Sequence, residues 1–246
     1  MDTNTLLRTF YTVERAGSEL LSDGGGPLGF DIQVALQLDY LIRGYQVDGI
    51  VETGCCLGDT TVYLARMYPD LPVITCDVDP GRAALTAERC RAHPNVRVLV
   101  GDSAELLPQM MIGLSRPLVY LDAHWGKSWP LVAELRAVQR GVIAVDDFNI
   151  GHPRFGYDSY DGVDCGPALV RAARRDLSEM YVSDPYGSYP LPCLQVGRRR
   201  GVGYIAADLP TALLAASDMF RLLPLTAEVL MPSWPIAEPF LVGGRR

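Results

Sequence analysis

Acidic residues follow short apolar runs at several places in the first 150 residues of this 246-residue chain. A carboxylate at such a position can accept hydrogen bonds from hydroxyl groups or coordinate a hard cation. Each acid taken alone could equally cap the helix that follows it. Their regular recurrence favours a single ligand site built from several strand ends. The acids concerned are Glu52, Asp77, Asp102, Asp122, Asp146 and Asp147.

Two glycines follow the first of these acids, in the run from Glu52 to Thr60. Gly54 and Gly58 flank Cys56 in a strand-to-helix turn, where glycine allows positive φ and a close approach of the backbone to a ligand. Their G-x-x-x-G spacing differs from the G-x-G-x-x-G dinucleotide fingerprint, which argues against a nicotinamide-dependent oxidoreductase. The acid before the turn favours a cationic or neutral, hydroxyl-bearing ligand over a pyrophosphate.

The next two strand ends offer groups for a nucleoside. Asp77 ends the second apolar run, where a carboxylate can accept two hydrogen bonds from ribose hydroxyls. Asp102 and Ser103 follow the third run, where a nucleobase edge would lie. Ser103 also fits the role of a helix N-cap, which is the structural alternative at this position.

Asp122, Asp146 and Asp147 end the fourth and fifth runs. Because adjacent parallel strands lie about 4.8 Å apart, these carboxylates would repel one another. A divalent cation removes that repulsion, and oxygen ligands with open positions suit Mg²⁺. The alternative is that Asp122 caps a helix while the other two acids face solvent. His124 or Lys127 could then remove a proton, and histidine is slightly favoured because it titrates near neutral pH without help.

The elements that must position these groups alternate between residues 46 and 150, with β-branched runs separated by amphipathic stretches. We predict an α/β fold, Rossmann-like and doubly wound, with a seven-stranded, mostly parallel sheet and helices on both faces. The expected strands are Gly49–Glu52, Val73–Asp77, Val96–Val100, Pro117–Leu121, Val142–Val145, Glu179–Val182 and Gly203–Ala206. The expected helices lie near 31–44, 59–68, 81–92, 103–112, 129–139 and 167–177.

Composition narrows the class of protein. The chain is 48% hydrophobic, which is enough for a packed core and excludes disorder. Its net charge of −7 argues against non-specific nucleic-acid binding. It contains no apolar stretch long enough for a membrane span and no secretory signal pattern, so we expect a cytoplasmic protein that binds neither nucleic acid nor membrane. Its six cysteines form no zinc-type spacing and are expected to be reduced thiols.

Taken together, these residues resemble the class I S-adenosylmethionine-dependent methyltransferases, particularly the metal-dependent catechol O-methyltransferase type. That family carries an E-x-G-x-x-x-G-x-S/T turn after its first strand, an acid at the end of its second and a V-G-x-S segment at the adenine. The matching positions are Glu52, Gly54, Gly58, Thr60, Asp77 and the run 100–103. The further glycine of the common methyltransferase pattern is replaced here by Cys56, as in the catechol enzymes.

The resemblance continues at the fourth and fifth strands, which end in L-D-H-W-K and A-D-N in that family. Here the run 121–127 contains two inserted residues, Ala123 and Gly126, and Asp147 stands in place of the asparagine. An aspartate at this place is similar to the metal-dependent sugar O-methyltransferases of natural-product pathways. The resemblance implies Mg²⁺ or a similar ion as a cofactor. The implied ligands are Asp122, Asp146 and Asp147, and the implied base is Lys127 or His124.

The resemblance implies methyl transfer from S-adenosylmethionine to a hydroxyl of a small-molecule acceptor, sugar-like or a natural product. A metal-dependent relative of the cephalosporin-hydroxylase type and a non-catalytic cofactor-binding subunit stay open as alternatives. The residues expected at the cofactor are Glu52, Gly54, Cys56, Gly58, Thr60, Asp77, Asp102, Ser103 and Asp122.

We expect one methyltransferase domain over residues 1–246, with three parts. Residues 1–45 form a helical cap, 46–208 the Rossmann-like core, and 209–246 an apolar, proline-rich C-terminal extension. Such an apolar segment should dock on the core or on a second copy, so a homo-oligomer is one expected assembly.

Overall fold

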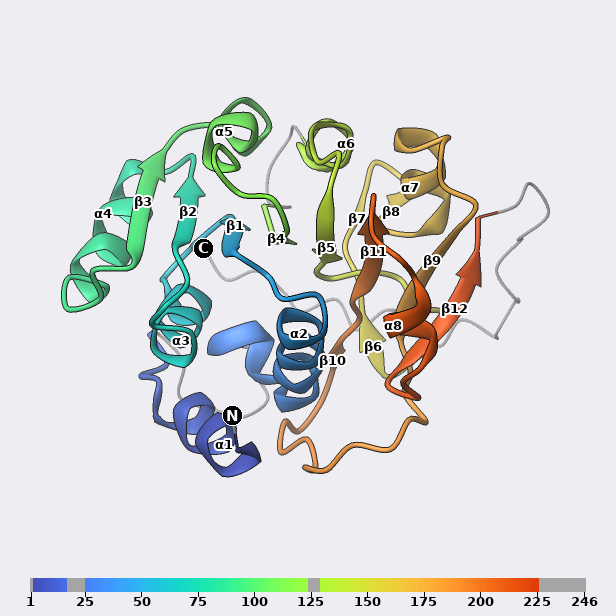
Figure 1. Ribbon diagram of the computed structural model, residues 1–246, viewed down its shortest axis with the longest axis horizontal. Coiled ribbons are helices and arrows are strands. Elements are labelled where there is room, and N and C mark those ends of the chain that lie inside the picture. Colours follow the sequence, from blue (N-terminus) through green and yellow to red (C-terminus); the bar gives the residue numbers. More distant parts are fainter. Residues whose placement is uncertain (1, 17–24, 124–128, 226–246) are drawn as a thin grey trace.

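A computed structural model describes residues 2–16, 25–123 and 129–225, and its centre is a twisted sheet of eight strands (Figure 1). The strand order is β12-β9-β11-β5-β4-β1-β2-β3. The strands are β1 (Gly49–Thr53), β2 (Val73–Asp77), β3 (Val96–Val100), β4 (Pro117–Leu121), β5 (Gly141–Val145), β9 (Glu179–Ser183), β11 (Gly203–Ala207) and β12 (Phe220–Pro224). Strands β1 to β5 run parallel, and β11 joins β5 in antiparallel orientation.

The parallel strands form because their side chains can be buried on both faces of the sheet. Every residue of β1, β2, β4 and β5 is buried, as the uninterrupted apolar runs predict. Strand β3 lies at one edge and alternates between half-buried and exposed positions. The carboxyl ends of the central strands therefore meet along one side of the sheet, which is where the acids lie.

Helices cover both faces (Figure 1). On one face α1 packs against both α2 and α3, and on the other α6 lies between α5 and α7. The α-helices are α1 (Thr3–Thr12), α2 (Ile32–Gly44), α3 (Asp59–Met67), α4 (Pro80–Arg89), α5 (Ser103–Met110), α6 (Leu131–Ala137), α7 (Pro167–Ala173) and α8 (Ala212–Ala215), with a 3₁₀ turn η1 (Pro27–Phe30) before α2.

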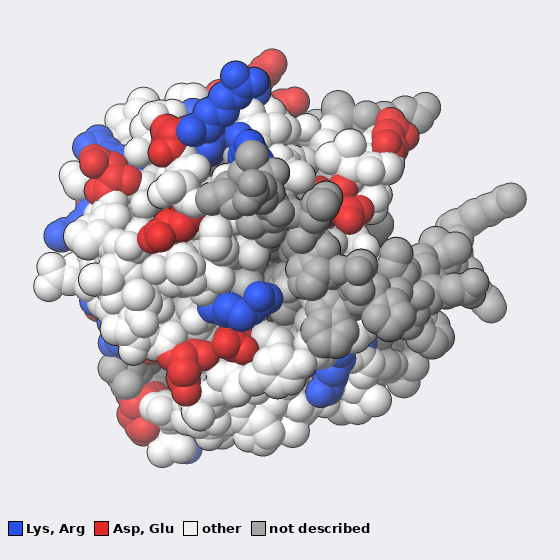
Figure 2. All heavy atoms as spheres, turned by 90° about the vertical axis from the view of Figure 1, so that its right-hand side faces the viewer, with Lys and Arg blue, Asp and Glu red and all other residues white. Residues whose placement is uncertain are grey.

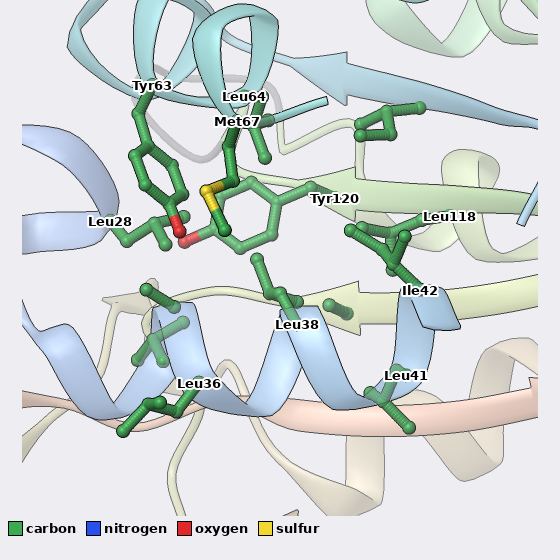
Figure 3. Close-up of a cluster of buried hydrophobic side chains, with 14 of the residues drawn as sticks. Leu28, Leu36, Leu38, Leu41, Ile42, Tyr63, Leu64, Met67, Leu118 and Tyr120 are labelled. Atoms are coloured by element: carbon green, nitrogen blue, oxygen red, sulfur yellow. The ribbon is translucent and has the colours of Figure 1, made fainter. Parts of the chain in front are cut away.

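Two hydrophobic clusters hold the layers together, one on each face of the sheet. Figure 3 shows part of the first, in which Leu38 of α2 points toward Tyr63 and Met67 of α3 and Tyr120 of β4. The rings of Tyr63 and Tyr120 are fully buried. This packing fixes the start of α3, and with it the turn between β1 and α3.

The predicted fold class is confirmed, with one difference in strand number. Strand β12 makes the sheet eight-stranded rather than seven-stranded, and it lies in the segment expected to be an extension. It pairs antiparallel with β9 along its whole length, from Phe220 opposite Ser183 to Pro224 opposite Glu179. A proline is tolerated there because an edge strand has one row of unpaired backbone groups.

The segment after β5 contains two-residue strands that the sequence pattern does not predict. Strand β6 (Phe155–Gly156) pairs with β10 (Arg199–Arg200), and β7 (Ser159–Tyr160) pairs with β8 (Val163–Asp164). The β6–β10 pair returns the chain to the carboxyl ends of the central strands.

The surface of the described residues is mixed in charge. Figure 2 shows acidic and basic side chains scattered among uncharged ones on the face it presents. None of the described helices is both long and apolar enough to span a membrane.

Candidate functional site

A cavity of about 830 Å³ lies at the carboxyl ends of β1, β2, β3 and β4. Eight of the nine residues expected at the cofactor line it, together with Arg82, Trp129 and Arg200. The eight are Glu52, Gly54, Cys56, Thr60, Asp77, Asp102, Ser103 and Asp122. The ninth, Gly58, is the N-cap of α3 and lies outside the lining, with φ in the left-handed region. The cavity therefore extends from the predicted nucleoside side to Asp122, the one of the three predicted metal ligands that lines it.

Gly54 allows the tips of β1 and β4 to approach closely. Its φ is 79°, and a Cβ at this position would lie 2.7 Å from the backbone oxygen of Asp122 and 2.9 Å from the Cα of Ala123. Because both neighbours are backbone atoms, a side chain would force the two strand tips apart.

Glu52 is a buried carboxylate whose partners come from the protein itself. Its Oε2 accepts hydrogen bonds from the hydroxyls of Thr61 and Thr75, the latter at 2.6 Å. Burial raises the pKa of Glu52 to about 7, although the two hydroxyls lower it. Glu52 is therefore held in a fixed position at the floor of the cavity.

Asp77 and Asp102 likewise accept hydrogen bonds from nearby backbone groups. Asp77 accepts from the backbone N–H of Cys56 and of Asp79, both at 2.9 Å. Asp102 is the N-cap of α5 and accepts from the N–H of Ala104 at 2.9 Å. The capping role expected of Ser103 therefore belongs to Asp102, and Ser103 is the first residue of the helix.

Thr60 links the glycine turn to the segment before α2. Its hydroxyl oxygen accepts from the backbone N–H of Leu28 at 2.9 Å. We call residues 25–31 the N-terminal strap; Gly25, Gly26 and Gly29 line the cavity. Leu28, Gly29 and Phe30 all have positive φ, between 53° and 61°. Such a strained backbone persists only where its surroundings fix it.

Asp122, Asp146 and Asp147 come together as predicted. One carboxylate oxygen from each lies within 4.8 Å of the others. Asp146 is 1% exposed, and its Oδ1 has no hydrogen-bond partner. A buried carboxylate oxygen without a partner of normal geometry is costly, and the nearby Tyr120 hydroxyl and the backbone N–H of Asp147, which lower the pKa of Asp146, offset part of that cost.

Burial and mutual repulsion shift the pKa values in this cluster. Burial, followed by the charge of Asp146, raises the pKa of Asp122 well above its usual range. Burial raises the pKa of Asp146 to about 6, against the lowering effect of Arg200. Burial and Asp147 raise that of the nearby Asp158 to about 6. All three shifts show an excess of negative charge in a poorly solvated place.

Arg200 of β10 is a site residue that the sequence analysis does not predict. Its Nη1 contacts Oδ2 of Asp147 directly and lies 3.6 Å from Oδ2 of Asp146. It stands in a run of three arginines far along the chain from these acids, and nothing in the run distinguishes it. The adjacent Arg199 forms a buried ion pair with Asp31 at 2.8 Å. The fold, rather than any motif, selects Arg200.

The two candidate bases, His124 and Lys127, lie outside the described residues. Their roles therefore stay predictions. Asp122 and Ala123 immediately before them line the cavity, as do Trp129 and Pro130 soon after them.

The fold and the residues around the cavity agree with the resemblance to class I S-adenosylmethionine-dependent methyltransferases. No protein-family model matches the chain. Catechol O-methyltransferase of Mus musculus is 26% identical over 121 residues, which is 45% of this chain and 45% of that protein. The O-methyltransferase imqG of Aspergillus flavus is 25% identical over 105 residues, 38% of this chain and 42% of that protein. These sequence matches confirm the resemblance to O-methyltransferases.

The chain spans less than half of the length of these two curated relatives. Among solved structures, the O-methyltransferase TomG from Streptomyces achromogenes gives a TM-score of 0.48 at 22% identity, covering 70% of this chain and 78% of that one. An O-methyltransferase from Bacillus cereus gives 0.46 at 18% identity, covering 84% and 91%.

Proposed function

We propose that this protein is an S-adenosylmethionine-dependent O-methyltransferase that uses a divalent cation, Mg²⁺ or a similar ion, to methylate a hydroxyl of a small molecule. The observation that carries the proposal is the single cavity described above. It extends from the glycine turn and its acids to Asp122, which belongs to an acidic cluster in which Asp146 has a buried carboxylate oxygen without a hydrogen-bond partner.

The cofactor would lie along the tips of β1, β2 and β3. Asp77 retains lone pairs for ribose hydroxyls, because each of its oxygens accepts one backbone hydrogen bond. Asp102 and Ser103 line the cavity where the adenine edge would lie, and Glu52 closes the floor. When bound, S-adenosylmethionine would supply a methyl group on a sulfonium; an oxygen nucleophile would bond to the methyl carbon as the carbon–sulfur bond breaks, with S-adenosylhomocysteine as the leaving group.

The residues of the acidic cluster fit a divalent cation. With all three carboxylates ionised around a bound cation, the cluster and the Arg200 guanidinium that contacts it would carry a net charge of minus two. Oxygen ligands of this kind suit Mg²⁺, which keeps open positions for substrate oxygens. When bound, such an ion lowers the pKa of a coordinated hydroxyl and fixes its direction.

His124 or Lys127 would remove the proton from the acceptor hydroxyl, since both follow Asp122 closely in the sequence. The acceptor would be sugar-like or a natural product. Asp147 supports this choice, because the metal-dependent sugar O-methyltransferases that the chain resembles also have an aspartate at this position. Positioning of the acceptor is the remaining task, because methyl transfer depends mainly on alignment of the reacting atoms.

Calorimetric titration with S-adenosylhomocysteine, with and without Mg²⁺, tests the proposal on the wild type, Asp77→Ala and Asp146→Asn. We expect micromolar cofactor-product binding that Asp77→Ala loses, and a magnesium heat that Asp146→Asn loses. Asp70→Asn is the matched control, because Asp70 is exposed and precedes β2 at the opposite end of the sheet. Absence of binding by the wild type under all conditions would overturn the methyltransferase proposal.

A further inference from the structure

We infer that Arg200 sets the charge of the proposed metal site and makes that site selective for a divalent over a trivalent ion. The inference rests on the proposed function, because it concerns the same acidic cluster. It goes further by assigning a role to a residue that contacts the proposed ligands and is not itself one of them.

The contacts of Arg200 place a permanent positive charge against the cluster. Its Nη1 touches Oδ2 of Asp147 and lies 3.6 Å from Oδ2 of Asp146, and its side chain is 26% exposed. A guanidinium stays protonated at all physiological pH values. When its three carboxylates are ionised, the cluster with Arg200 therefore offers an ion two uncompensated negative charges rather than three.

The position of Arg200 is built into the fold. Its side chain passes directly over Gly29 of the N-terminal strap, where a Cβ would lie 2.0 Å from Nε and 2.5 Å from Cγ of the arginine. The strap is in turn fixed by the bond from Leu28 to Thr60 and by the buried pair between Asp31 and Arg199. Gly29 thus leaves the space that the arginine stem occupies.

Arg198 shows that proximity in sequence does not give the same contact. Its guanidinium donates to the backbone oxygen of Tyr157 at 2.8 Å, and its side chain is exposed. It carries the same charge on the same segment but has a different partner. Arg198 therefore provides a matched control for Arg200.

Coulomb repulsion between Arg200 and a bound ion is proportional to the charge of the ion. If removal of the arginine charge raises the affinity for Mg²⁺ about tenfold, the same effect raises that for Tb³⁺ about thirtyfold. The ratio of the two affinities therefore changes about threefold toward the trivalent ion. A change of this ratio reports the charge of the site separately from its geometry.

The test is calorimetric titration of the full-length protein with Mg²⁺ and with Tb³⁺, for the wild type, Arg200→Gln, Arg200→Lys and Arg198→Gln. Glutamine keeps a hydrogen-bond donor near Asp147 while removing the charge, and lysine keeps the charge. We expect Arg200→Gln to bind both ions more tightly with the ratio shifted toward Tb³⁺. Arg200→Lys and Arg198→Gln should keep the wild-type ratio.

The outcomes separate the two proposals. Suppose that the wild type binds Mg²⁺. If Arg200→Gln then binds both ions more weakly, or changes both affinities by the same factor, the inference is wrong while the metal site stands. If only Arg200→Gln binds Mg²⁺, the arginine controls the cluster as inferred, and the proposed metal dependence of the wild type is wrong. If no variant binds either ion, both proposals are overturned.

Discussion

The two halves of the site, the cofactor side of the cavity and the acidic cluster that meets the cavity at Asp122, differ in the partners of their acidic side chains. On the side of β1, β2 and β3, Glu52, Asp77 and Asp102 accept hydrogen bonds from hydroxyls and backbone N–H groups close to them. On the side of β4 and β5, Arg200 reaches the cluster from a distant segment, and Asp146 keeps an unpartnered oxygen. The first half is complete once the chain has folded, whereas the second half still needs positive charge.

The largest effect should come from removing a charge in the second half. Asp146→Asn is expected to lower methyl transfer by at least about a thousandfold, because loss of a metal ligand removes several kcal/mol of stabilisation. Affinity for S-adenosylhomocysteine should stay within about threefold, since the first half is intact. Turnover assays and calorimetry on the same sample measure the two effects. Equal losses in both would contradict the division of the site into two halves.

Glu134 of α6 is a buried carboxyl near Ser103 and Thr53 that does not line the cavity, and it tests how the fold tolerates an unsatisfied acid. It is fully buried, and neither carboxylate oxygen has a partner of normal hydrogen-bond geometry. Burial raises its pKa to about 7, although Ser103 and Thr53 lower it. A raised folded-state pKa means that stability is full below the unfolded value and is lost as pH rises through the folded one.

The free energy of unfolding of the wild type, relative to Glu134→Gln, should therefore fall by on the order of 3 kcal/mol between pH 4.5 and pH 8. Urea denaturation of both proteins at several pH values measures this difference. Glu105→Gln on the exposed side of α5 serves as the control and should follow the wild type. A difference that does not change with pH would show that Glu134 ionises normally.

Asp77→Ala should weaken binding of S-adenosylhomocysteine by about a hundredfold, because charge-assisted hydrogen bonds to two hydroxyls contribute roughly 3 kcal/mol together. Magnesium affinity should be unchanged, which is the converse of the result expected for Asp146→Asn. Titration of each ligand separately gives both numbers. A loss of magnesium binding in Asp77→Ala would mean that the two halves are coupled.

The smallest expected effect concerns the N-terminal strap. Thr60→Val removes the acceptor for the N–H of Leu28 and should cost about 1 kcal/mol of stability. Cofactor affinity should fall about fivefold, because the strap lines the first half. Thermal unfolding and calorimetry test this, with Thr211→Val outside the strap as a control. An unchanged affinity would show that the strap does not take part in binding.

The strand ends could be predicted because burial on both faces leaves an uninterrupted apolar run followed at once by an acid. Strands β2, β3 and β4 have the predicted bounds, and β1, β5, β9 and β11 differ by one residue. Helix ends are less well predicted, as at α6 and α7, because amphipathic spacing continues beyond the last hydrogen-bonded turn.

The parts that could not be predicted depend on contacts between distant segments. Arg200 belongs to the site because two-residue strands pair across a long separation, and Leu28 because its N–H meets Thr60. Strand β12 contains Arg221 and Pro224, which interrupt its apolar run, and it pairs along its whole length with β9. No local spacing encodes these pairings.

Strand β12 also has a consequence for aggregation. It covers the edge of β9 with five paired residues, from Phe220 to Pro224. A chain shortened to end at residue 208 would leave β9 as an exposed, largely apolar edge strand, which is a template for intermolecular pairing. The proline that ends β12 and the exposed arginine at position 221 within it act as gatekeepers in the intact protein.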